Sequence, residues 1–74
     1  MSSRELVVLL RKGGAVFVRQ KGTSHAIYQR FVAGRRYAAP VQMGKKSLDP
    51  EYSKQVLRQL GFTNEEIQRL LSER

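Results

Sequence analysis

The sequence has no cysteine, no tryptophan and a single histidine among its 74 residues. The lack of cysteine excludes disulfides and thiolate chemistry. One histidine and six scattered carboxylates supply too few ligands for a zinc or two-metal site built by the protein alone. We therefore expect the protein to use no metal and no cofactor.

Long apolar runs are also missing. The longest, from Leu6 to Leu10, is far too short to span a bilayer or to form the apolar part of a signal peptide. Hydrophobic residues still make up 41% of the chain, which is enough for a small core in one domain covering residues 1–74. We expect this domain to be cytoplasmic and to bind no membrane.

Acidic residues are scarce. Six Asp and Glu stand against 14 Lys and Arg, which gives a formal net charge of +8. No acidic residue lies between Lys12 and Lys46, and all six fall in segments that we expect to be helical. This segregation favours a basic surface of strands and loops, which suits a polyanion such as RNA. The candidate RNA-binding side chains of this segment are Arg19, Lys21, Arg30, Arg35, Arg36, Lys45 and Lys46.

Capping patterns indicate three helices, over about 2–13, over about 50–60, and from Thr63 towards the C-terminus. The first and the last open with a capping box, and the second opens with Asp followed by Pro. Glycines follow the first two helices, where they would end them.

Three β-rich runs lie between the first two helices, at about 15–20, 25–31 and 35–41, and glycine-containing turns separate them. Pro40 cannot donate to a sheet ladder, so the third strand belongs at an edge. The sequence therefore predicts an α+β fold in the order α-β-β-β-α-α, with a three-stranded antiparallel sheet whose second strand is central. We expect the first two helices to cover one side of that sheet.

The second strand has two different faces. The alternation does not say which of them carries the core. One face holds His25, Ile27, Gln29 and Phe31, and the other holds Ala26, Tyr28 and Arg30.

His25 is the candidate catalytic residue, since imidazole is the side chain best suited to proton transfer near neutral pH. It follows the turn Gly22-Thr23-Ser24, whose backbone amides and hydroxyls can bind a phosphate oxygen. A general base there would take the proton of a ribose 2′-hydroxyl, which then attacks the adjacent phosphorus. The donor to the leaving 5′-oxygen stays open between Lys21, Tyr28, Ser24 and water. A lone histidine in a small domain is also often an ordinary surface or packing residue.

The order of these segments resembles the HicA-type toxins of bacterial toxin–antitoxin systems. The most specific similarity is the Gly-[Ser/Thr]-x-His turn, here Gly22 to His25, and the helix ending in Arg58-Gln59-Leu60-Gly61-Phe62 supports it. The resemblance implies a fold like that of double-stranded-RNA-binding domains and ribonuclease activity on messenger RNA. It also implies that His25 is catalytic and that a HicB-type antitoxin inhibits the toxin. We expect that antitoxin to be acidic and to cover His25.

The second helix departs from the family pattern at its start. Glu51-Tyr52-Ser53 stands where the family often has Gly-Thr-Leu. This change alters the helix start and leaves the turn before His25 untouched.

Two other functions fit the same residues. One is a non-catalytic RNA-binding module in which His25 contacts phosphate or a 2′-hydroxyl. The other is a protein-interaction domain whose basic face serves an acidic partner. The sequence gives less support to a DNA-binding function, because no expected helix presents a row of Arg, Asn and Gln suited to a major groove.

Overall fold

The computed structural model describes residues 1–73, and it confirms the predicted order of elements. All three predicted caps are present, with capping boxes at Ser2/Glu5 and Thr63/Glu66 and an Asp49 cap before Pro50. Each predicted bound lies within one residue of the observed one. In chain order the elements are α1 (Ser3–Lys12), β1 (Val16–Lys21), β2 (His25–Val32), β3 (Arg35–Gln42), α2 (Pro50–Gln59) and α3 (Asn64–Ser72).

The three strands form one antiparallel sheet in the order β1-β2-β3, so β2 is central and β3 is an edge strand, as Pro40 requires. The pairing of β1 with β2 shifts between Phe17 and Arg19, where Val18 is an extra residue in a β-bulge. This irregularity was not predicted.

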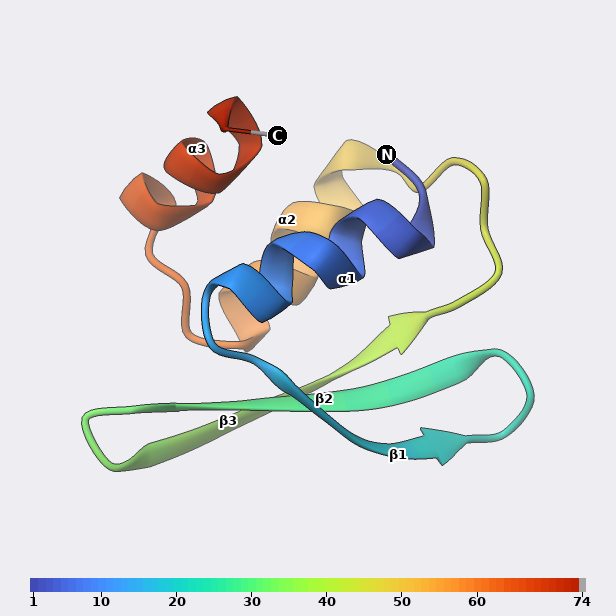
Figure 1. Cartoon of the computed structure of the whole chain (residues 1–74), viewed down its shortest axis with the longest axis horizontal. Coiled ribbons are helices and arrows are strands. Elements are labelled where there is room, and N and C mark those ends of the chain that lie inside the picture. The colour runs from blue at the N-terminus through green and yellow to red at the C-terminus, as the bar shows by residue number, and fades with distance from the viewer. Residues whose placement is uncertain (74) are drawn as a thin grey trace.

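The helices lie together on one side of the sheet and leave the other side uncovered (Figure 1). Along β2 the residues facing the helices are the buried Ala26, Tyr28 and Arg30, which settles the question that the sequence left open. His25 and the residues that alternate with the buried set therefore lie on the uncovered side, which we call the open face of the sheet.

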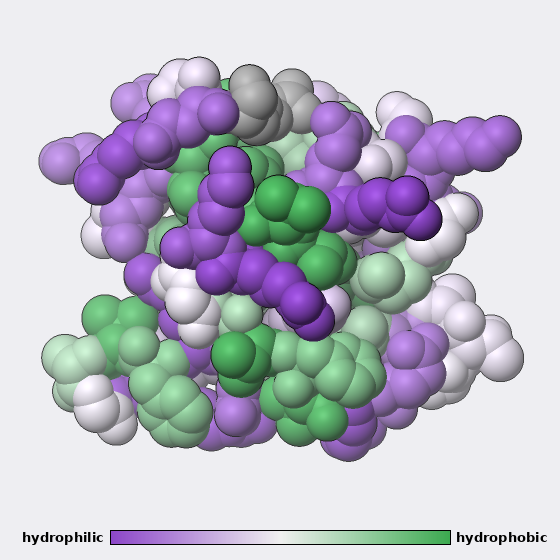
Figure 2. Space-filling view, in the orientation of Figure 1, coloured by the Kyte–Doolittle hydropathy of each residue, from purple (hydrophilic) through white to green (hydrophobic). Residues whose placement is uncertain are grey.

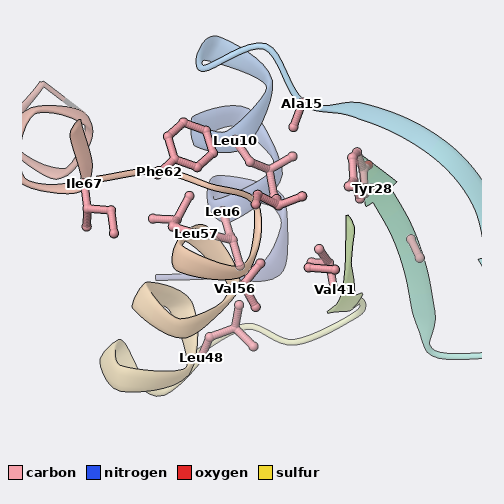
Figure 3. Packing of buried hydrophobic residues seen from close by; sticks show 13 residues of the cluster. Leu6, Leu10, Ala15, Tyr28, Val41, Leu48, Val56, Leu57, Phe62 and Ile67 are labelled. Atoms are coloured by element: carbon pink, nitrogen blue, oxygen red, sulfur yellow. The ribbon is translucent and has the colours of Figure 1, made fainter. Parts of the chain in front are cut away.

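The core lies between the sheet and the helices, with aliphatic side chains of α1 and α2 packed over β2 and β3 (Figure 3). Leu6, Leu10 and Leu57 are completely buried. Phe62 and Ile67 join the same cluster, so α3 packs on the core through its entry turn. Continuous packing of this kind holds the sheet, and with it the residues of the open face, in fixed register.

Several large apolar side chains remain exposed, chiefly Val16, Phe17 and Phe31 on the strands. Apolar side chains gather over the sheet in the lower part of Figure 2, whereas long hydrophilic side chains project from the helical layer above. Among the aromatic residues of β1 and β2, Tyr28 is buried, whereas Phe17 and Phe31 are exposed. Among residues 1–73, no helix has the length and apolar character needed to cross a membrane.

Candidate active site

His25 is the first residue of β2 and lies at one end of the open face. Lys21 of β1 and Gln42 of β3 are its direct partners in the two ladders. Directly paired residues of an antiparallel sheet project to the same side, so these three side chains form a row across the sheet. The imidazole is partly exposed, and a cation and an amide flank it.

The turn before His25 contains Gly22, Thr23 and Ser24, all exposed, and it joins β1 to β2. Gly22 has a φ of 67°, in the left-handed region where a side chain is disfavoured. The Ser24 carbonyl accepts a hydrogen bond of 2.7 Å from the amide of Met43, which fixes the turn to the chain after β3. The turn and His25 therefore belong to one ordered end of the sheet.

Hydrogen bonds from two helices fix the strand next to His25. The backbone amide of Gln42 donates to the Tyr52 hydroxyl at 2.9 Å, and the Ser3 hydroxyl donates to the backbone carbonyl of Gln42 at 2.7 Å. Tyr52 belongs to the segment that departs from the family pattern, so this departure supplies a contact that holds the residue opposite His25. The sequence did not reveal it, because the register of β3 against β2 is set by tertiary packing.

The candidate proton donors lie in different places. Lys21 faces the same side as His25, and Ser24 precedes it in the turn. Tyr28 is on the buried side of β2 and only 4% exposed. Lys21, Ser24 and water therefore remain as donors to a leaving oxygen, and Tyr28 does not.

Arg30 does not lie on the surface at all. Its guanidinium donates to the carbonyls of Gly13 at 2.8 Å and Leu60 at 3.2 Å, and it forms an ion pair of 3.1 Å with Glu66. It also lies 3.7 Å from the centre of the Phe62 ring. The prediction that Arg30 is available to RNA does not fit this position, because these partners inside the protein occupy its donors.

The other predicted RNA-binding residues form two groups at opposite ends of the sheet. On the open face near His25 lie Lys21 and the turn, then Arg19, which pairs with Ile27. The loop with Lys45 and Lys46 begins at the same end of the sheet, but it is fixed to Ser3 of α1 on the helical side. At the far end of β2, about 20 Å away for six residues of strand, lie Arg35 and Arg36.

The two arginines at the far end have partners of their own. Arg36 donates to the Gln29 side chain at 2.8 Å on the open face. Arg35 lies 5.2 Å from the centre of the Tyr37 ring. The structure thus brings together only the cations near His25.

The charge distribution of the site is one-sided. The carboxylates of Glu5, Asp49, Glu51, Glu65, Glu66 and Glu73 all belong to helices or their caps, and none belongs to a strand. The row of Lys21, His25 and Gln42 therefore lies in a positive region that attracts a phosphodiester. Within this row the histidine is the group suited to accept a proton, and the lysine is suited to stabilise negative charge on phosphate oxygens.

The family model described as the HicA toxin of bacterial toxin–antitoxin systems matches residues 3–62 of this chain. The chain belongs to the HicA toxin family. The match runs from the start of α1 through Phe62, and so it includes the whole sheet, the turn before His25 and α2. Membership makes the protein the toxin of a toxin–antitoxin system, with a cognate antitoxin as partner.

Helix α3 lies outside the matched residues, although Ile67 packs on the same core. No curated protein and no solved structure matches the chain.

Proposed function

We propose that this HicA toxin is a metal-independent endoribonuclease that cleaves messenger RNA in the cytoplasm, with His25 as its catalytic residue. The observation that carries the proposal is the row across the open face, in which Lys21 and Gln42 flank the only histidine of the chain. The exposed turn beside it offers backbone amides and hydroxyls to a phosphate oxygen.

The proposed reaction is an internal transfer. The His25 imidazole takes the proton of a ribose 2′-hydroxyl, and the 2′-oxygen forms a bond to the adjacent phosphorus. The bond from that phosphorus to the 5′-oxygen breaks, and Lys21, Ser24 or water protonates the leaving oxygen. The products are a 2′,3′-cyclic phosphate and a 5′-hydroxyl. Acid–base help of this kind contributes on the order of 10²–10⁴ in rate, and Lys21 adds electrostatic stabilisation.

The test compares His25→Ala with Gln29→Ala, a control on the same strand and the same face. His25→Ala should abolish cleavage of purified RNA and growth arrest in a bacterial host. Its circular dichroism spectrum should match that of the parent, and its RNA affinity should stay within a few-fold of the parent's. RNA affinity should persist because many cations contribute to it. Cleavage should continue in a chelator, and an RNA with 2′-deoxyribose at the cut position should resist.

Two results would contradict the proposal. Undiminished cleavage by His25→Ala would remove this residue from the chemistry. RNA binding by the parent with no cleavage would identify a non-catalytic RNA-binding module instead.

We also propose how the antitoxin acts. An acidic HicB-type antitoxin should place carboxylates against Arg19 and Lys21 and cover His25, because these residues lie on the side of the sheet that no helix covers. Complex formation should weaken as salt concentration rises. Diethyl pyrocarbonate should modify His25 in the free toxin and not in the complex, as followed by mass spectrometry. Equal modification in both would contradict this mode of inhibition.

A further inference from the structure

A groove of about 600 Å³ runs between α1 and the loop that follows β3. Its lining includes four cationic side chains, Arg4 and Arg11 from the helix and Lys45 and Lys46 from the loop. Val7 and Met43 supply apolar surface between them. In Figure 1 this loop passes beside the N-terminal part of α1.

The groove is positive throughout. No carboxylate lines it, and none of its four cations forms a salt bridge within residues 1–73. The acidic residue nearest in sequence, Glu5, accepts a hydrogen bond of 2.8 Å from the Ser2 amide as part of the α1 cap. All four cations are exposed, so their charges face solvent and any ligand in the groove.

The two walls of the groove are tied to each other. The Ser3 amide donates to the Lys45 carbonyl at 2.9 Å, and the Lys45 amide donates to the Ser3 hydroxyl at 3.0 Å. The loop is therefore fixed on α1, and the cations of the two walls are presented from one preformed surface.

The groove lies on the helical side of the sheet, at the same end as the turn before His25. Met43, which lines the groove, donates its backbone amide to the carbonyl of Ser24, the residue before His25. Gln42, the residue before Met43, is the partner of His25 in the sheet. An RNA strand held at His25 therefore reaches the groove by passing around the end of the sheet, next to the turn before His25.

We propose that this groove binds the phosphates of the RNA strand that flanks the bond at His25. Arg4 and Arg11 lie two helical turns apart, about 10 Å along the axis, so they contact different phosphates of one strand. Apolar side chains between the cations offer a surface for ribose and bases, and the arginines can also stack on bases. The cations on both walls and the short distance along the chain from Met43 to the residues that hold the His25 turn favour a strand of the proposed RNA substrate over an acidic protein segment. The inference rests on the proposed ribonuclease function.

Binding is measured in a His25→Ala background, so that no RNA is cut during the experiment. The groove variant is Arg4→Gln with Arg11→Gln. Its matched control is Arg58→Gln with Arg69→Gln, which removes two exposed arginines of α2 and α3 and changes the net charge equally. A second groove variant, Lys45→Gln with Lys46→Gln, tests the loop wall without altering α1.

The probe is a labelled single-stranded RNA of about twelve nucleotides, titrated at several salt concentrations. Loss of two phosphate contacts lowers the slope of log affinity against log salt concentration by about 1.4. If the groove variant and the parent bind the RNA equally near 1 M salt, the affinity of the variant at about 0.1 M salt should be roughly 20-fold lower. The control pair should lose less than about threefold by the same measure. With His25 restored, the groove variant should cleave a dinucleoside monophosphate at the parent rate, since that substrate does not reach the groove.

Equal affinity of the groove and control variants for the RNA would overturn the inference. A twelve-residue acidic peptide that binds the parent more tightly than the RNA, and loses affinity in the groove variants, would also overturn it and assign the groove to protein. Failure of the proposed function gives a different signature: the parent would bind the RNA without cleaving it, while the binding comparison keeps its meaning.

Discussion

Replacement of Arg30 by Met should destabilise the fold and should not act through RNA. The substitution keeps an apolar stem of similar length but removes the guanidinium, whose side chain is only 10% exposed. The carbonyls of Gly13 and Leu60, at the C-terminal ends of α1 and α2, then lose their hydrogen bonds. Each unsatisfied buried carbonyl costs about 1–3 kcal/mol, and the lost contact with the Phe62 ring adds about 1 kcal/mol.

The total, about 3–7 kcal/mol, is a large part of the roughly 4–11 kcal/mol available to a chain of this length. Urea unfolding followed by circular dichroism should therefore show a midpoint lower by more than about 1 M. Arg36→Met is the matched control, because Arg36 is exposed on the open face and bonds only to Gln29 there. It should cost less than about 0.5 kcal/mol. An Arg30→Met protein as stable as the Arg36→Met protein, but weaker in RNA affinity, would refute this reasoning and return Arg30 to the RNA surface.

Two further predictions concern Glu66 and Gly13, which are both partners of Arg30. The hydrogen bond from the Thr63 amide, with Arg30 nearby, lowers the pKa of Glu66 below its ordinary 4.5. The ionised Glu66 therefore contributes stability that is present above that pH and is lost as the pH falls through the lowered pKa. Glu66→Gln keeps the capping box, and the difference in unfolding free energy from the parent should shrink on acidification below about pH 4.5; a constant difference would argue against this. Gly13→Ala should destabilise by about 1–3 kcal/mol in urea unfolding, although its φ of −87° suits alanine, because the added Cβ would meet the Phe62 ring; the slight stabilisation usual for Gly→Ala would contradict the contact.

Local signals in the sequence were sufficient for the elements and their order. Capping boxes, the Asp-Pro start and the glycine turns act over three or four residues, so they can be recognised without knowing what packs against them. The position of His25 after an exposed turn is local in the same sense, and so is the segregation of the carboxylates into helices. The candidate site could therefore be named before its surroundings were known.

Tertiary structure alone decided which of these residues face one another. The alternation of β2 allowed either side to be buried, and only the packing of α1 and α2 against Ala26 and Tyr28 placed His25 on the open face. The same choice buried Arg30, which no local pattern distinguishes from a surface arginine. The partners of Arg30 are 17 to 36 residues away in sequence, and the groove likewise joins α1 to a loop more than 30 residues later. Such contacts depend on how the elements pack, so charge and spacing along the chain cannot specify them.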